Sequence, residues 1–174
     1  MCAVLQGVPE RCEALVQNYV AGFHWRSVIL SFGEAVGYYV EPYGDGLSEG
    51  SPIRATFAAT LGAIQPKGWR LIVLNVALQP RCDQTSCGVW IPVINRAFVA
   101  YCNSLEFGRG TFATFLPRWL SRLGRKAIDL STVRGRGDRR AAVEGNLAFI
   151  AEERRLLRER LVQAASNGFP PAAR

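Results

Sequence analysis

Apolar residues in the first half of the chain are arranged as in short strands. Residues 26–32 are apolar and β-branched, which predicts a strand, and a turn is expected at 33–35. The apolar run at 36–40 predicts a second strand that forms a hairpin with the first. A third run, 69–78, is apolar on both faces and is therefore expected to be a central strand.

The remaining apolar segments have the spacing and length of helices. In chain order, helices are predicted at residues 8–18, 52–64, 87–104, 111–123 and 141–165. The last one carries an apolar stripe made of Val143, Leu147, Ile150, Leu157 and Leu161. The arginine- and glycine-rich residues 125–140 predict a loop, and 169–174 predict a disordered tail. Strands followed by helices indicate an α+β fold.

The chain has 174 residues and 49% hydrophobic residues, which is enough for one domain with a real core. The prediction is a single domain over 1–165 and a flexible tail over 166–174. No apolar run approaches the ~18 residues of a membrane helix, and the N-terminus lacks the pattern of a signal peptide. An intracellular monomer without a membrane partner is therefore expected, in the nucleus or cytoplasm.

Five cysteines in a chain of this length argue against a disulfide framework, because the number is odd. Cys82 and Cys87 are too loosely spaced for a zinc knuckle, and the single histidine, His24, is far away. No metal site and no cofactor are therefore predicted.

The net charge of +7 is unevenly distributed. Residues 1–106 hold seven Lys/Arg and eight Asp/Glu, whereas residues 107–174 hold fourteen and six. The basic half is either a solvated helical surface or a surface that binds a polyanion such as DNA. Under the second interpretation the candidate DNA contacts are Arg134, Arg136, Arg139 and Arg140.

Cys87 stands where a polar turn, 83–86, meets an apolar segment of helix length. A helix N-terminus offers unpaired N–H groups and the positive end of the helix dipole. Both favour a thiolate, which is the nucleophilic form of cysteine. The alternative is that Cys87 is simply a small buried side chain.

A base and a carboxylate are expected at one edge of the predicted hairpin. His24 comes directly before the first strand, and Glu41 ends the second. Neighbouring strands lie about 5 Å apart, so the two side chains are plausible neighbours. A carboxylate beside an imidazole fixes its tautomer and stabilises the imidazolium. Together with Cys87 they form a candidate Cys–His–Glu triad.

These residues also resemble a known group of enzymes. The motifs are His24-Trp25, Glu-Pro-Tyr-Gly at 41–44, and Cys87-Gly88 followed by apolar residues. They are similar to those of the cysteine protease clan that contains adenain and the SUMO-specific proteases. The resemblance covers roughly residues 16–104. It implies a papain-like, adenain-like fold with a small mixed or antiparallel sheet and the nucleophile at the start of a central helix. The basic helical part would be 107–165.

The resemblance assigns a role to each matching residue. His24 would be the general base, Glu41 its orienting acid and Cys87 the nucleophile. The clan's glutamine donates to the oxyanion; Gln79 is the first choice for this role and Gln84 the second. The substrate-binding residues would be Trp25 and Gly88.

The implied activity is that of a cysteine endopeptidase cleaving polypeptides at glycine-containing sites. This would be a viral-type maturation protease or a ubiquitin-like-protein deconjugase, with DNA or another polyanion as an activator. One alternative within the clan is an acetyltransferase effector that uses acetyl-CoA. Another is a non-catalytic nucleic-acid-binding protein built around residues 107–174.

Overall fold

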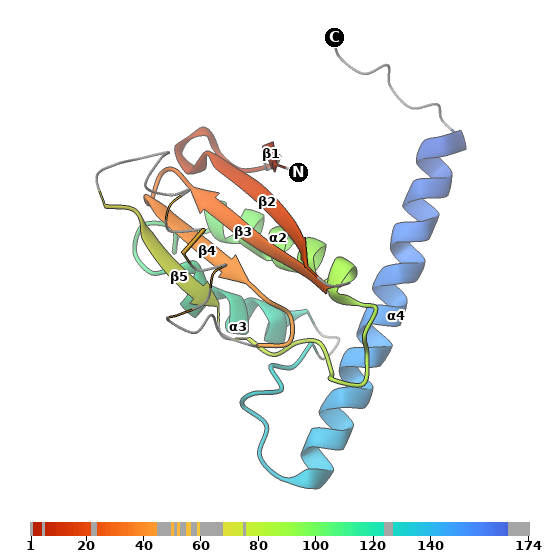
Figure 1. Cartoon of the computed structure of the whole chain (residues 1–174). Helices are drawn as coiled ribbons and strands as arrows, with labels where there is room; N and C mark the ends of the chain where they lie inside the picture. The colour runs from red at the N-terminus through yellow and green to blue at the C-terminus, as the bar shows by residue number, and fades with distance from the viewer. Residues whose placement is uncertain are drawn as a thin grey trace.

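Figure 1 shows a computed structural model of the chain, in which a small sheet and several helices form an α+β fold. The structure describes residues 2–4, 6–21, 24–44, 50, 52, 55–56, 59, 68–74, 76–123 and 127–166. Most of the predicted helix 52–64 and the predicted tail 169–174 lie outside these residues. No helix in the described part is both long and apolar enough to cross a membrane.

Among the described residues, the sheet has five strands, which lie side by side in the order of the chain. They are β1 (Cys2–Val4), β2 (Ala14–Ala21), β3 (His24–Ser31), β4 (Val36–Val40) and β5 (Arg70–Leu74). Strands β1 to β4 pair antiparallel, and β5 is parallel to β4. The predicted hairpin is therefore confirmed, with Ser27 opposite Val40.

One short 3₁₀ turn and three long helices are described beside the sheet. They are the turn Glu10–Cys12 and the helices α2 (Cys87–Cys102), α3 (Phe112–Arg122) and α4 (Arg136–Ser166). Helix α3 starts with a capping box in which Thr111 and Thr114 exchange side-chain hydrogen bonds, which satisfies N–H groups that lack helical partners. Helices α2 and α3 agree closely with the segments predicted from the sequence.

The two faces of the hairpin are buried against different clusters. Ile29 and Tyr38 belong to the main core, where the Tyr38 ring packs against Phe98 of α2 and Phe112 of α3. Figure 1 shows both helices on this side of the sheet. The opposite face carries a smaller buried cluster of Val28, Leu30 and Tyr39. Burying each large apolar side chain contributes roughly 1.5–3 kcal/mol, so the hairpin that carries the candidate site is held from both sides.

Two strand-region predictions were wrong. Residues 8–18 do not form an α-helix; a 3₁₀ turn leads into β2, whose residues pair one by one with β3. The run 69–78 is not a central strand, because β5 ends at Leu74 and is the last strand of the sheet in the described part. The strand is apolar because both of its faces pack against other residues: Ile72 packs on the main core, and Val73 packs on the smaller cluster.

Helix α4 begins earlier than expected, and its buried face matches the predicted stripe only in part. The predicted loop 125–140 is already helical from Arg136. The buried side chains are Ala142, Asn146, Phe149 and Ile150, and of these only Ile150 belongs to the predicted stripe. Leu161 of that stripe is 63% exposed, because the last turns of α4 extend away from the sheet and the other helices (Figure 1).

Candidate active site

Cys87 is the first residue of α2 and is buried, with 2% of its surface exposed. The helix starts where the Ser86 carbonyl accepts the N–H groups of Val89 (2.9 Å) and Trp90 (3.0 Å). The N–H groups of Cys87 and Gly88 have no acceptor among the described residues. The positive end of the helix is therefore open next to the thiol.

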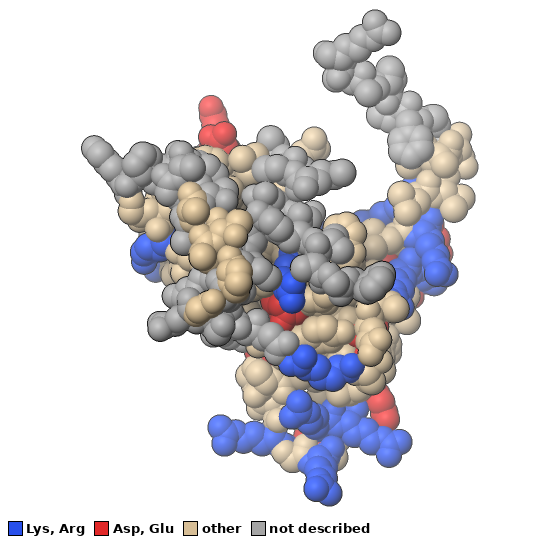
Figure 2. All heavy atoms as spheres, viewed as in Figure 1, with Lys and Arg blue, Asp and Glu red and all other residues tan. Residues whose placement is uncertain are grey.

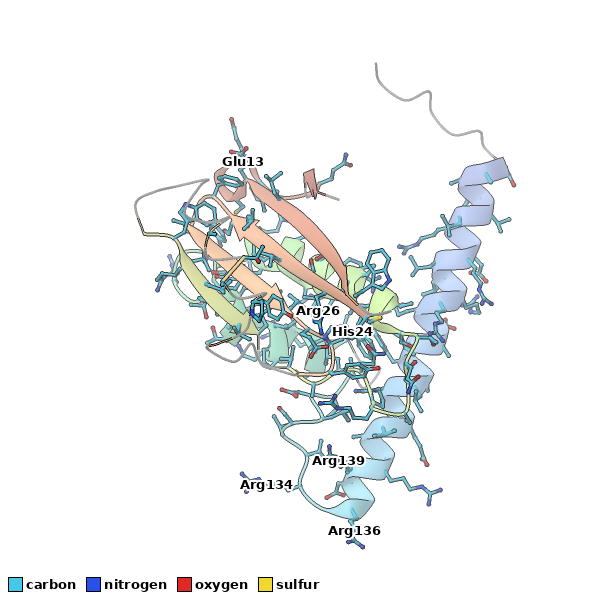
Figure 3. The ribbon with its side chains drawn as sticks, viewed as in Figure 1. Glu13, His24, Arg26, Arg134, Arg136 and Arg139 are labelled. Carbon is cyan, nitrogen blue, oxygen red and sulfur yellow. The ribbon has the colours of Figure 1, made fainter. Side chains whose placement is uncertain are left out.

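The beginning of β3 lies against this thiol. The Trp25 N–H donates a hydrogen bond to Cys87 Sγ over 3.3 Å. The Trp25 side chain is 42% exposed, and its ring passes 3.7 Å from the point where a Cβ on Gly88 would lie. Figure 3 shows the neighbouring His24 at this end of the sheet, close to the start of α2. The predicted base, His24, therefore directly precedes in the chain the residue that contacts the predicted nucleophile.

His24 and Glu41 are brought together by the hairpin. The Nε2 atom of His24 forms a hydrogen bond with Oε1 of Glu41, which is only 3% exposed. The same Oε1 accepts the Tyr43 N–H at 3.0 Å. Because Nε2 is bound to the carboxylate, Nδ1 is the imidazole nitrogen that remains for a proton of Cys87. His24 is the first residue of β3 rather than the residue before it.

Tyr43 contacts both His24 and Glu41, and it was not identified as a site residue from the sequence. Its ring stacks on His24 with 4.6 Å between centroids and 15° between planes. Its hydroxyl donates to the Asp83 carbonyl at 2.9 Å. Burial raises the pKa of Tyr43, and the nearby side chains of Cys87, Asp83 and Glu41 add to this through their electrostatic interaction with the hydroxyl. The hydroxyl therefore stays protonated. In the sequence, the only signal for Tyr43 was its place as the aromatic residue of the Glu-Pro-Tyr-Gly motif.

Gln79 is buried beside Tyr43 and lies beyond the end of β5 at Leu74. Its position follows from the Pro42 carbonyl, which accepts the N–H groups of Leu78 (2.9 Å) and Gln79 (2.8 Å). The Gln79 side-chain amide donates to the Tyr43 hydroxyl at 3.3 Å and to the Asp83 carbonyl. The loop after the Glu41 strand and the approach to α2 are therefore tied together.

Gln84, the second choice for the oxyanion donor, is exposed on the loop before α2. The neighbouring Asp83 carboxylate accepts the Thr85 N–H at 3.1 Å, which closes a tight turn. A side chain that points into solvent from such a turn is not preorganised, so the geometry favours Gln79 over Gln84 for this role.

Two residues of α4 reach the same loops and were also missed. Asn146, fully buried, donates to the carbonyls of Leu78 and Ile128, each at 2.8 Å. Arg154 donates to the hydroxyls of Thr85 and Ser86, each at 2.8 Å. These contacts join parts of the chain that are distant in sequence, so no local pattern could have indicated them.

Comparisons of the chain with protein-family models, curated proteins and solved structures find no match. The roles of the site residues therefore rest on their geometry and on the resemblance of the motifs.

The described residues contain no group of three or more His, Cys, Asp or Glu side chains that could hold a metal ion. In the described part, Cys12, Cys82, Cys87 and Cys102 are not joined by disulfide bonds, and of these four only Cys82 is exposed. The four candidate DNA contacts lie away from the triad, in the segment before α4 and in its first turns. Figure 3 shows Arg134, Arg136 and Arg139 around this end of the helix, and Figure 2 shows Lys and Arg side chains gathered there.

Proposed function

We propose that this chain is a cysteine endopeptidase with Cys87 as the nucleophile, His24 as the general base and Glu41 as the orienting acid. One observation supports this above all. In β3, the Glu41-bound His24 directly precedes Trp25, whose backbone N–H contacts the Cys87 thiol at the open N-terminus of α2. A helix-borne nucleophile at a sheet edge is the arrangement expected for a papain-like, adenain-like protease.

In the proposed reaction, Nδ1 of His24 takes the proton of Cys87. The thiolate forms a bond to the carbonyl carbon of a peptide, and the carbonyl oxygen becomes an oxyanion. The C–N bond then breaks as the imidazolium gives its proton to the leaving amine. Water, activated by His24, hydrolyses the thioester, which releases the acid and restores the thiol. Glu41 stays ionised and stabilises the imidazolium in both halves of the reaction.

The oxyanion is expected to bind the N–H of Cys87, since that group has no acceptor among the described residues. Gln79 is proposed as the second donor. Its amide contacts Asp83 and Tyr43, so substrate binding would have to draw one of its N–H groups towards the oxyanion. The exposed ring of Trp25 above Gly88 would form one wall of the substrate cleft, which suits glycine beside the scissile bond.

The proposed substrates are polypeptides with glycine-containing cleavage sites, either a viral precursor or a ubiquitin-like conjugate. The decisive experiment is covalent labelling with a glycine-ended peptide electrophile. Wild type and Cys82→Ala, which removes the exposed thiol nearby, should be labelled at Cys87. Cys87→Ala and His24→Ala should not. Labelling of Cys87→Ala at the wild-type rate would exclude the triad.

An acetyltransferase with the same triad is the competing enzyme. It would consume acetyl-CoA and leave peptide bonds intact, whereas the proposed protease releases peptide fragments and leaves acetyl-CoA unchanged. Measuring both products in one incubation with wild type and Cys87→Ala separates the two reactions.

Binding of DNA or another polyanion is a second candidate function, suggested by the start of α4. Arg134, Arg136, Arg139 and Arg140 are all exposed, and only Arg140 has an ion pair there, with Glu144 at 2.9 Å, among the described residues. Cations in the first turn oppose the helix dipole, so these arginines do not help to form α4. Their position is better explained by an anionic partner that binds this end of the helix.

The salt dependence of DNA binding tests this second function. Each arginine that contacts a phosphate should add about one unit to the slope of log affinity against log salt. Replacing Arg134, Arg136 and Arg139 by Gln should therefore lower the slope by about three. Replacing Arg155 and Arg158, which lie further along α4, should leave the slope unchanged. Equal slopes for all variants would exclude this end of α4 as the binding surface.

A further inference from the structure

Arg154, near the middle of α4, contacts the residue that precedes the nucleophile. Its Nη2 atom donates to Thr85 Oγ1 and to Ser86 Oγ, each over 2.8 Å. The two partners stand 68 positions or more before it in the chain. Arg154 also lies outside residues 16–104, so the motif resemblance assigns it no role.

Ser86 occupies the capping position of α2 but does not cap the helix. A capping serine usually has an extended backbone, and its hydroxyl accepts the N–H of the second or third helical residue. The Ser86 backbone is helical instead, with φ −93° and ψ −4°, and its hydroxyl makes no capping bond. The hydroxyl accepts the hydrogen bond from Arg154, and the N–H of Gly88 remains open.

The position of Arg154 is fixed by the packing of α4 on α2. One turn before Arg154, the Phe149 ring stacks on Trp90, with 5.4 Å between centroids and 22° between planes. Beside it, Glu153 forms an ion pair with Arg96 of α2 at 2.7 Å. A guanidinium stays charged at any working pH and can hold two acceptors at once. Arg154 is therefore a rigid donor aimed at the loop before Cys87.

We propose that Arg154 is a positioning residue that keeps the Ser86 hydroxyl away from the N-terminus of α2. The N–H of Gly88 then stays free as a third donor to the oxyanion, beside the N–H of Cys87 and the amide of Gln79. Without Arg154 the hydroxyl would turn towards the N–H of Gly88 and compete with the substrate. This inference rests on the proposed protease function and deepens it.

The activity test uses Arg154→Met, Ser86→Ala and the double variant on a glycine-containing peptide substrate. Loss of one oxyanion donor costs about 10²–10³-fold in kcat, so partial competition by a hydroxyl should cost about tenfold. Arg154→Met should therefore lower kcat about tenfold with little change in KM, and Ser86→Ala should restore it to within about threefold of wild type. Arg155→Met is the matched control, since Arg155 pairs only along the helix surface with Glu152 and Glu159 in the described part.

Amide hydrogen exchange of Gly88, followed by NMR, gives a readout that needs no activity. Exchange should slow in Arg154→Met, because the freed hydroxyl caps the helix, and should return to the wild-type rate in the double variant. Unchanged Gly88 exchange, or a double variant as slow in turnover as Arg154→Met, would overturn the positioning role. If wild type cleaves no peptide, the protease proposal fails, while the exchange experiment still decides the role of Arg154.

Discussion

Two glutamates lie at opposite ends of β4 and have different surroundings. Glu34, in the turn before the strand, accepts hydrogen bonds from the hydroxyls of Ser31 (2.9 Å), Tyr38 (3.1 Å) and Tyr101 (2.8 Å). None of these hydroxyl groups ionises near neutral pH. The partners of Glu34 therefore hold it as a structural anchor between the hairpin and α2.

Glu41, directly after the strand, has a titratable partner in His24. It binds the His24 imidazole and the Tyr43 N–H, and the residue next to His24 contacts Cys87. A buried carboxylate in this fold is therefore not by itself a sign of catalysis. The difference lies in what surrounds it: hydroxyl groups at one end, and at the other an imidazole whose strand neighbour contacts the Cys87 thiol.

The largest expected effect is that of Glu41→Gln on turnover. An amide cannot stabilise the imidazolium and favours the wrong tautomer, so kcat should fall by roughly 10³–10⁴-fold. Steady-state kinetics on a peptide substrate, with circular dichroism to check the fold, provides the measurement. Activity within tenfold of wild type would mean that Glu41 has no catalytic partner in His24.

The matched variant at the other end, Glu34→Gln, should affect stability instead. It weakens charge-assisted hydrogen bonds from three hydroxyls, so the free energy of unfolding should fall by about 2 kcal/mol. Turnover at a temperature where the variant is folded should stay within about threefold of wild type. Urea denaturation and kinetics on the same sample test both parts, and a loss of activity without a loss of stability would reverse the comparison.

The tyrosines around Glu34 should make the protein sensitive to alkali. Burial raises the pKa of Tyr38 and of Tyr101, and the nearby charge of Glu34 adds to both. Above about pH 10 tyrosines ionise in the unfolded chain but not in the folded one. Stability is therefore fully present at lower pH and should fall with rising pH by about 1.4 kcal/mol per pH unit for each tyrosine.

Denaturation of wild type and Tyr38→Phe between about pH 8 and pH 11 measures this contribution. The free energy of unfolding of the variant should fall less steeply with pH, and the difference in slope should equal the contribution of one tyrosine. Parallel curves for the two proteins would show that Tyr38 ionises alike in the folded and unfolded states.

The smallest expected effect is that of Tyr43→Phe, which removes a hydroxyl at the Glu41 end. The hydroxyl bridges Gln79 and the Asp83 carbonyl, so its loss should lower kcat by about fivefold, equivalent to about 1 kcal/mol. The stacking on His24 is kept in this variant and lost in Tyr43→Ala, which should be clearly slower. Equal rates for the two variants would show that only the hydroxyl matters.

Local patterns were sufficient to predict the hairpin and the helix that starts at Cys87. Strand residues 26–40 and helix residues 87–104 depend mainly on neighbours in sequence, and so does the meeting of His24 with Glu41 across two paired strands. The amino-acid sequence alone was therefore enough to suggest these three residues and a role for each. Their catalytic roles remain predictions.

Other features depend on contacts that sequence patterns do not encode. Residues 14–21 form a strand because β3 offers a pairing edge, although Leu15 and Val16 also suit a helix. Gln79 is placed by the Pro42 carbonyl rather than by the end of a strand. The buried face of α4 is set by its partners and includes the polar Asn146, which a search for an apolar stripe passes over.

The link between Arg154 and Ser86 also has a bearing on protein synthesis. During translation the thiol, the imidazole and the glutamate leave the ribosome long before α4 has been made, since Arg154 follows Ser86 by 68 residues. With the proposed role of Arg154, the candidate active site of a nascent chain would be incompletely ordered until α4 emerges. The order of synthesis would then delay proteolysis, and incomplete nascent chains would be protected from cleavage by one another.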